Sequence, residues 1–117
     1  MRVIIAGSRT IHDMDVLRQA IAESGFEITS LFVGGARGVD ALAREWAISD
    51  RYCWEVHQIL AEWDKYGRAA GPLRNEKMAQ NADALIAVWD GRSRGTADMI
   101  ARARKHGLQV FVKEVRP

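Results

Sequence analysis

Short, continuously apolar runs alternate along this chain with segments whose apolar residues recur at helical spacing. The runs at residues 3–6 and 84–89 contain only apolar side chains, as is typical of strands buried on both faces of a sheet. Between the runs, apolar residues recur three or four positions apart, as they do along one face of a helix. Because parallel strands need a crossover connection, usually a helix, the alternation predicts a parallel sheet covered by helices.

Five strands and four helices follow from this pattern. The first and fourth strands are the most apolar and should lie side by side at the centre, whereas the third alternates in polarity and suits an edge. The expected strand order is 3-2-1-4-5, in a single Rossmann-like, doubly wound α/β domain over residues 1–117 with helices on both faces. The expected strands are residues 3–6, 31–33, 54–60, 84–89 and 108–112.

Glycine and proline mark the expected ends of the helices. Gly25 and Gly107 follow apolar helical patterns and should end the first and the last helix. Pro72 should be the first residue of the third helix, because the first helical position needs no backbone N–H. That start places Arg74 and Asn75 in the first turn of the third helix.

Composition narrows the class of protein. The 117 residues are 48% hydrophobic and 27% charged, close to globular averages, which excludes a disordered or fibrous chain. No run approaches the ~18 apolar residues of a membrane helix, and the apolar stretch at residues 3–6 is too short for a signal sequence. The single cysteine, Cys53, excludes an internal disulfide framework and a multi-cysteine zinc site. We expect a cytoplasmic protein without a membrane segment, a metal or a cofactor.

Glycine and arginine are concentrated in the strand-to-helix segments. Eight of the ten glycines and six of the 13 arginines lie there. In a doubly wound sheet these segments meet at the carboxyl ends of the strands, where ligands bind. Glycine lets backbone N–H groups approach an anion, and arginine recognises phosphate or carboxylate. The net charge of +2 suits one small phosphate better than a polyanion. The expected ligand-binding residues are Gly7, Ser8, Arg9, Gly34, Gly35, Arg37, Gly38, Asp40, Arg74, Asn75, Trp89, Ser93, Arg94, Gly95 and Thr96.

Three of these residues have two interpretations each. Gly95 precedes Thr96 at the start of the last helix, where the backbone N–H groups and the Thr96 hydroxyl can hold a phosphate; alternatively, Thr96 is only the N-cap. Asp40 opens the second helix, either as a helix-start carboxylate or as an acceptor for a ribose hydroxyl. Trp89 ends a central strand and either stacks on a base or packs in the core.

Four stretches together carry a family resemblance. They are GSR at residues 7–9, GGARGVD at 34–40, WDKYGRAAGPLRN at 63–75 and WDGRSRGT at 89–96. In this order, and across nearly the whole chain, they resemble the SLOG superfamily and most of all its small YpsA-related branch. The resemblance implies a Rossmann-like domain that binds nucleotides or nucleotide-derived ligands in signalling, nucleotide processing or phage defence. It also implies a homodimer or larger homo-oligomer, since many relatives pair through helices.

Two related groups imply different activities. Residues 35–40 are similar to a motif of DNA-processing protein A, which binds single-stranded DNA. Gly95 and Thr96 resemble part of the Pro-Gly-Gly-x-Gly-Thr-x-x-Glu signature of the lonely-guy phosphoribohydrolases, which cleave the N-glycosidic bond of a nucleoside monophosphate. In this chain the first three signature positions read Gly-Arg-Ser at residues 91–93. The glutamate position is Met99, and the nearest carboxylate is Asp98.

Three functions therefore stay open. The first is binding of a nucleotide or nucleotide-derived phosphate ligand, as a sensor, carrier or processing domain. The second is hydrolysis of an N-glycosidic or phosphate bond of a nucleotide, with Asp98, Asp90 or Asp40 as the catalytic carboxylate. The third, binding of single-stranded DNA, is not favoured, because the interleaved aromatic and basic lining that a strand needs is incomplete.

Overall fold

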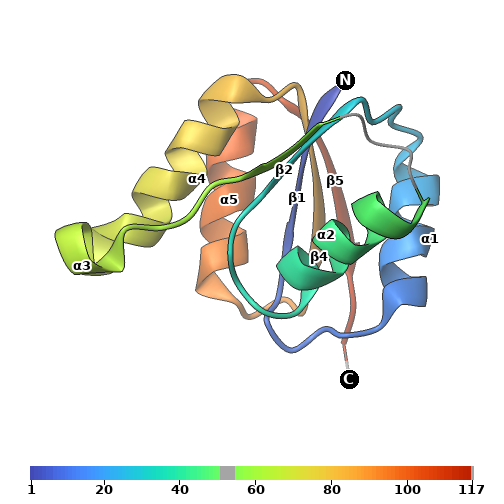
Figure 1. The fold of residues 1–117 in the computed structure, drawn as a ribbon, viewed down its shortest axis with the longest axis horizontal. Coiled ribbons are helices and arrows are strands. Elements are labelled where there is room, and N and C mark those ends of the chain that lie inside the picture. The colour runs from blue at the N-terminus through green and yellow to red at the C-terminus, as the bar shows by residue number, and fades with distance from the viewer. Residues whose placement is uncertain (51–54, 117) are drawn as a thin grey trace.

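A five-stranded parallel sheet runs through the middle of the molecule (Figure 1). In this computed structural model, which describes residues 1–50 and 55–116, the strands lie in the order β3-β2-β1-β4-β5. The predicted α/β fold and its strand order are therefore confirmed. The strands are β1 (Arg2–Gly7), β2 (Ser30–Val33), β3 (Glu55–Gln58), β4 (Ala84–Trp89) and β5 (Gln109–Glu114).

Helices cover both faces of the sheet. The four longer ones are α1 (Met14–Ser24), α2 (Val39–Asp50), α4 (Ala70–Asn81) and α5 (Arg94–Lys105). The pair α1 and α2 lies on one face, and the pair α4 and α5 lies on the other (Figure 1). Every helix among the described residues is too short or too polar to cross a membrane.

The core consists of two apolar layers, one on each face of the sheet. Along β1, Val3 and Ile5 point toward α1 and α2, where Leu17 packs, and Ile4 points toward α4 and α5, where Met78 packs. All five side chains are buried. Burying such a side chain stabilises the fold by about 1.5–3 kcal/mol, which explains why β1 is apolar at each of its fully buried positions.

The sheet has a buried centre and an exposed edge. β1 pairs with β4 from Val3 opposite Ala84 to Gly7 opposite Val88, so the two most apolar strands are neighbours. All four residues of β3 are exposed at the edge, as predicted. The predicted strand over residues 54–60 is longer than β3, and its first residue, like Cys53, lies outside the described residues.

The third helix begins earlier than predicted. α4 starts at Ala70, so Pro72 is its third residue and not its first. The N–H groups of a first helical turn have no partner within the helix, and proline therefore removes no hydrogen bond there. As a result, Arg74 and Asn75 lie in the second turn of α4 and not in the first.

The segment before α4 is also more ordered than a simple connection. Residues 63–69 form the short helix α3 (Trp63–Tyr66) and a 3₁₀ turn, η1 (Gly67–Ala69). Both project beyond the end of α4, at the far left of Figure 1. Their side chains are largely exposed, which leaves Trp63 available at the surface.

Candidate functional site

A cavity of about 300 Å³ opens at the carboxyl ends of β1 and β4. Its walls come from the segments that follow β1, β2 and β4, together with the inner side of α4. This is the place where the strand order reverses and where doubly wound sheets bind ligands. We call it the first cavity; it is lined by Ala6, Gly7, Arg9, Thr10, Gly34, Ala36, Asp40, Arg74, Asn75, Met78, Ser93, Arg94, Gly95, Thr96 and Met99.

The N-terminus of α5 forms one wall of the first cavity. Ser93 is the N-cap residue, but its side chain makes no capping hydrogen bond to the described residues of the helix. Its hydroxyl instead donates to the Ser8 Oγ at 3.0 Å. The N–H groups of the first turn, at Gly95 and Thr96, are thus available to an anion. The interpretation of Thr96 as an N-cap is wrong, because the helix begins at Arg94 and Thr96 is its third residue.

Asp90 shapes the loop between β4 and α5. Its Oδ1 accepts hydrogen bonds from the backbone N–H groups of Arg92 and Ser93, both at 2.8 Å. These hydrogen bonds lower the pKa of the Asp90 carboxyl to about 2. Asp90 does not line the first cavity. The geometry therefore gives Asp90 a part in holding the loop.

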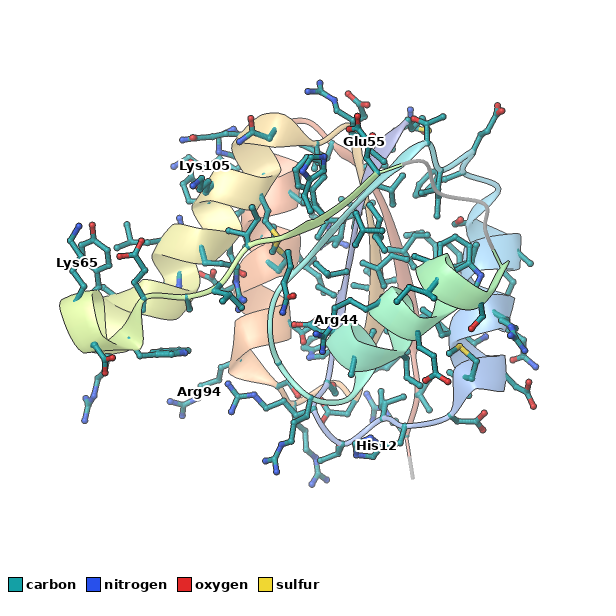
Figure 2. All side chains as sticks on the ribbon, viewed as in Figure 1. His12, Arg44, Glu55, Lys65, Arg94 and Lys105 are labelled. Carbon is teal, nitrogen blue, oxygen red and sulfur yellow. The ribbon has the colours of Figure 1, made fainter. Side chains whose placement is uncertain are left out.

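Three arginines bring positive charge to the first cavity. Arg9 and Arg94 are exposed at its mouth, and Arg74 is half-buried in its wall. The Arg74 Nε donates to the Asn75 Oδ1 at 2.9 Å, which fixes the guanidinium. Within the described residues, neither Arg9 nor Arg94 forms an ion pair with a carboxylate. Figure 2 shows Arg94 and His12 at one edge of the molecule, with nitrogen-tipped side chains between them.

Asp40 is the buried carboxyl of the first cavity. It lies in the first turn of α2, and its Oδ2 accepts a hydrogen bond from the Ala36 N–H at 3.2 Å. Burial raises the pKa of the Asp40 carboxyl, and the Ala36 N–H and the charges of Arg74, Arg44 and Arg9 only partly oppose that rise. A Cβ on Gly34 would collide with the Arg74 Nη1 and lie 2.7 Å from the Asp40 Oδ2, so a larger residue there would displace one or both of these side chains.

Asp98 is held away from the first cavity. Its Oδ2 accepts hydrogen bonds from the Asn75 Nδ2 at 3.0 Å and from the Arg102 Nε at 2.9 Å. Asn75 does line the cavity, and its Nδ2 also donates to the Gly95 carbonyl at 3.2 Å. Asn75 thereby ties α4 to the start of α5. Of the three candidate catalytic carboxylates, Asp40 alone lines the first cavity.

A second cavity of about 360 Å³ adjoins the first. Three residues line both cavities: Arg9, Ala36 and Arg74. The other lining residues of the second cavity are Gly35, Arg37, Leu60, Ala61 and Trp63. It is therefore partly basic and partly apolar.

Three predicted ligand-binding residues line neither cavity. Ser8 and Gly38 are buried behind the first cavity, where a Cβ on Gly38 would lie 2.6 Å from the Arg9 carbonyl carbon. Trp89 packs against the α4–α5 side of the core, and its Nε1 donates to the Ser93 carbonyl at 3.0 Å. The structure thus favours the core interpretation of Trp89. The remaining predicted residues line the first cavity, or in the case of Gly35 and Arg37 the second.

Sequence reasoning missed the apolar floor of the first cavity. Ala6, Met78 and Met99 form it, together with the small side chain of Ala36 in the wall. Ala6 is the last residue of β1 whose side chain belongs to the core layer beneath α4 and α5. Met99 lies one turn into α5, at the position where the resemblance places a glutamate. The pattern of apolar residues gave no signal here, because core and cavity floor have the same composition. The described residues contain no cluster of histidine, cysteine and acidic side chains that could hold a metal ion.

Comparisons with known proteins give a family, a relative from a phage and a structure with the same fold. A family model described as YspA, cpYpsA-related SLOG family matches residues 1–66. The Gene 61 protein of Mycobacterium phage D29 is 36% identical over 120 aligned positions, which cover 94% of this chain and 94% of the phage protein. The structure of DNA processing protein A from Streptococcus pneumoniae matches 95% of this chain with a TM-score of 0.69 and 18% identity. The chain spans about half of that structure, 49% of its length.

Proposed function

Because the chain belongs to the YspA, cpYpsA-related SLOG family, we propose that it binds a nucleotide or a nucleotide-derived phosphate ligand in the first cavity. The family and the fold shared with DNA processing protein A fit a nucleotide-related role. One observation carries the proposal: the start of α5 and three arginines converge on one cavity at the switch point of the sheet. Uncapped helical N–H groups and arginines favour a phosphate for the same electrostatic reason.

Each wall of the first cavity has a role in this proposal. The phosphate lies against the N–H groups of Gly95 and Thr96, and Arg9 and Arg94 neutralise its charge from the mouth. Asp40, buried on the opposite wall, accepts a hydrogen bond from a ribose hydroxyl. The apolar floor lies beneath the sugar and excludes water from these hydrogen bonds.

Substitution of the two exposed arginines tests the proposal. We expect Arg9→Ala and Arg94→Ala each to weaken binding roughly ten- to a hundredfold, because each removes a charge-assisted hydrogen bond. Isothermal titration calorimetry measures this against the four ribonucleoside 5′-monophosphates, NAD and ADP-ribose. Arg104→Ala is the matched control, since Arg104 is exposed in the last turn of the same helix. If both site variants bind as the parent does while melting normally, the phosphate lies elsewhere.

Hydrolysis is a second candidate function, and Asp40 is the observation that favours it. A carboxyl with a raised pKa that lines a ligand cavity can donate a proton to a departing base. Asp98 and Asp90 are each occupied by other hydrogen bonds, which makes Asp40 the carboxyl to test. Incubation of the same ligands with the parent protein and with Asp40→Asn, followed by chromatography, measures the release of free base. Release that persists in Asp40→Asn contradicts this role, and intact ligand throughout supports binding alone.

A further inference from the structure

We propose that the second cavity is the base-binding subsite of the nucleotide whose phosphate lies at α5, with Trp63 as its stacking surface. This inference rests on the proposed function and adds to it where the base lies. The ligand then runs from α5 across Arg9 and Arg74 to Trp63. Four observations support it: the lining residues that the two cavities share, the exposure of Trp63, the small and apolar groups in the rest of the lining, and the position of the arginines.

The two cavities adjoin each other. Arg9, Ala36 and Arg74 line both, so a ligand that extends from one cavity to the other passes along these three residues. Pockets that bury a small organic ligand usually measure about 300–1,000 Å³. The first cavity, at about 300 Å³, is at the lower limit of that range, and the second adds about 360 Å³. The two together therefore offer a ligand about twice the space of the first cavity alone.

Trp63 presents an accessible aromatic surface to the second cavity. It is 52% exposed, although it begins a helix and lies beside α4. A Cβ built on Gly71 would lie 3.2 Å from the Trp63 Cη2 but 3.9 and 4.0 Å from the two neighbouring ring atoms. Such distances describe an approach to the edge of the ring. Gly71 therefore supports the indole at its edge and does not cover its faces.

Small and apolar groups form the rest of the subsite. Leu60 is 63% exposed and lies against the backbone of Gly35, where a Cβ would collide with the Leu60 Cδ2. Ala36 and Ala61 add only methyl groups to the lining. An aromatic ring beside small apolar groups is the environment that planar nucleobases select, because stacking needs a flat and partly desolvated surface.

The arginines explain why a base, and not a protein side chain, is the expected occupant. Arg37 lines the second cavity, and Arg9 and Arg74 lie at its junction with the first. No carboxylate is found among the described residues that line the second cavity. An anionic ligand is therefore attracted along its whole length, and a base linked to a phosphate satisfies both the apolar and the basic groups.

The test compares a complete nucleotide with its sugar phosphate. Calorimetry measures the affinity of the parent and of Trp63→Ala for the four ribonucleoside 5′-monophosphates and for ribose 5-phosphate. We expect Trp63→Ala to weaken nucleotide binding by roughly ten- to a hundredfold and to leave ribose 5-phosphate binding unchanged. Trp63→Phe, which keeps an aromatic face, should retain most of the affinity. Tyr66→Ala is the matched control, because Tyr66 is an exposed aromatic residue of the same short helix that does not line the second cavity.

The outcomes separate this inference from the proposed function. Nucleotide binding that Trp63→Ala leaves intact places the base outside the second cavity and overturns the inference alone. An equal loss for the nucleotides and for ribose 5-phosphate overturns it as well, since Trp63 then shapes the site without contacting a base. If the parent binds neither a nucleotide nor ribose 5-phosphate, the proposed function fails together with the inference. Thermal melting of each variant confirms that it is folded.

Discussion

Two glycines with nearly the same backbone conformation play different parts in the molecule. Gly25 (φ 70°) ends α1, and nothing lies within 4 Å of a Cβ placed there. Gly38 (φ 71°) precedes α2, and a Cβ there would collide with the backbone of Ser8 and Arg9. A positive φ disfavours both substitutions by alanine, but only Gly38 also needs the empty space. Alanine at Gly25 would therefore introduce backbone strain alone, whereas alanine at Gly38 would introduce the same strain and a steric collision.

We predict that Gly25→Ala lowers the free energy of unfolding by about 1 kcal/mol, the cost of a left-handed L-residue. Gly38→Ala should lower it by roughly 3 kcal/mol or more, because it adds a backbone collision to that cost. Chemical denaturation measures both. Gly38→Ala should in addition weaken ligand binding, since it displaces the loop that carries Arg9. Equal losses of stability would contradict the crowding described at Gly38.

Asp90 should make the protein sensitive to acid. Its folded pKa of about 2 lies below the ordinary value of 3.8, so its stabilising effect is present above pH 3.8 and is lost as the pH falls toward 2. We predict that Asp90→Asn is less stable than the parent at neutral pH and loses less of its stability over that acidic window. Thermal melts across the window measure the difference. Asp64→Asn, on the exposed α3, controls for the loss of one surface charge.

Asp40 should change the stability with pH in the opposite direction to Asp90. Its folded pKa is raised by burial, so its contribution to stability is fully present below the unfolded pKa of 3.8 and is lost as the pH rises from there through the higher folded pKa. We predict that Asp40→Asn melts at the same temperature as the parent or higher at neutral pH, because asparagine removes the buried charge and can still accept from Ala36. A clear fall in melting temperature would show instead that the negative charge of Asp40 stabilises the fold through the nearby arginines.

For single residues, the sequence predicted which side chains line the first cavity better than it predicted the contacts that orient them. Arg9, Asp40 and Arg94 were predicted from loop position, and all three line the first cavity. Asp98 was a catalytic candidate because it stands beside the signature position, but its orientation depends on Asn75, which lies 23 residues away in the chain. Such a contact follows from the packing of two helices and has no local signal.

At the scale of elements, a network of side chains joins α4 to α5. The Arg102 Nη1 donates to the Glu76 Oε1 at 3.0 Å, and its Nε donates to the Asp98 Oδ2 at 2.9 Å. The His106 Nε2 lies 2.7 Å from the other Glu76 oxygen. Since Asp98 also accepts from Asn75, the network reaches from the surface to the wall of the first cavity.

We predict that Arg102→Gln lowers the melting temperature by roughly 1–5 °C, as expected for the loss of partly exposed ion pairs. It should also weaken nucleotide binding modestly, because Asn75 and the start of α5 lose a shared support. Differential scanning calorimetry and titration calorimetry measure the two effects. Lys105→Gln, an exposed charge in the last turn of the same helix, is the control. A melting temperature equal to that of the control would contradict a structural role for the network.

Element boundaries were predictable where capping residues define them and not elsewhere. Gly25 ends α1 as expected, with its N–H donating to the Ala22 carbonyl at 3.3 Å. The prediction that the third helix begins at Pro72 was wrong, because proline is tolerated throughout the first turn of a helix. A proline therefore indicates the start of a helix only to within a few residues. α3 has only four residues, too few to show an apolar period, so its helical conformation has no signal in the sequence.

For the whole molecule, the strand order was predictable because burial controls it. The two strands without polar residues had to be central, and the alternating one had to lie at an edge. The extent of the domain and the predicted homo-oligomer stay predictions. The exposed apolar side chains of Ile48, Leu60 and Leu73 would suit either a partner or a ligand, and periodicity does not distinguish these uses.

The distribution of charge over the molecule predicts how it responds to nucleic acid. The net charge of +2 is small for a protein that binds a polyanion, and Figure 2 shows Glu55 at the edge of the molecule opposite Arg94. We predict that a single-stranded oligonucleotide binds no more tightly than a mononucleotide, with a salt dependence of about one or two phosphate contacts and not many. Fluorescence anisotropy at several salt concentrations measures this. A steep salt dependence would favour the DNA-binding alternative.

Ser8 is fully buried between the two central loops. Its carbonyl accepts from the N–H groups of Ile11 and Val39, and its hydroxyl accepts from the Asp90 N–H. One side chain and one carbonyl thus hold together the ends of β1 and β4 and the start of α2. The N–H groups of Ile11, Val39 and Asp90 should consequently exchange with solvent at similar rates, since a single opening event exposes all three. A ligand bound at any one of the three loops would slow exchange in the other two without touching them.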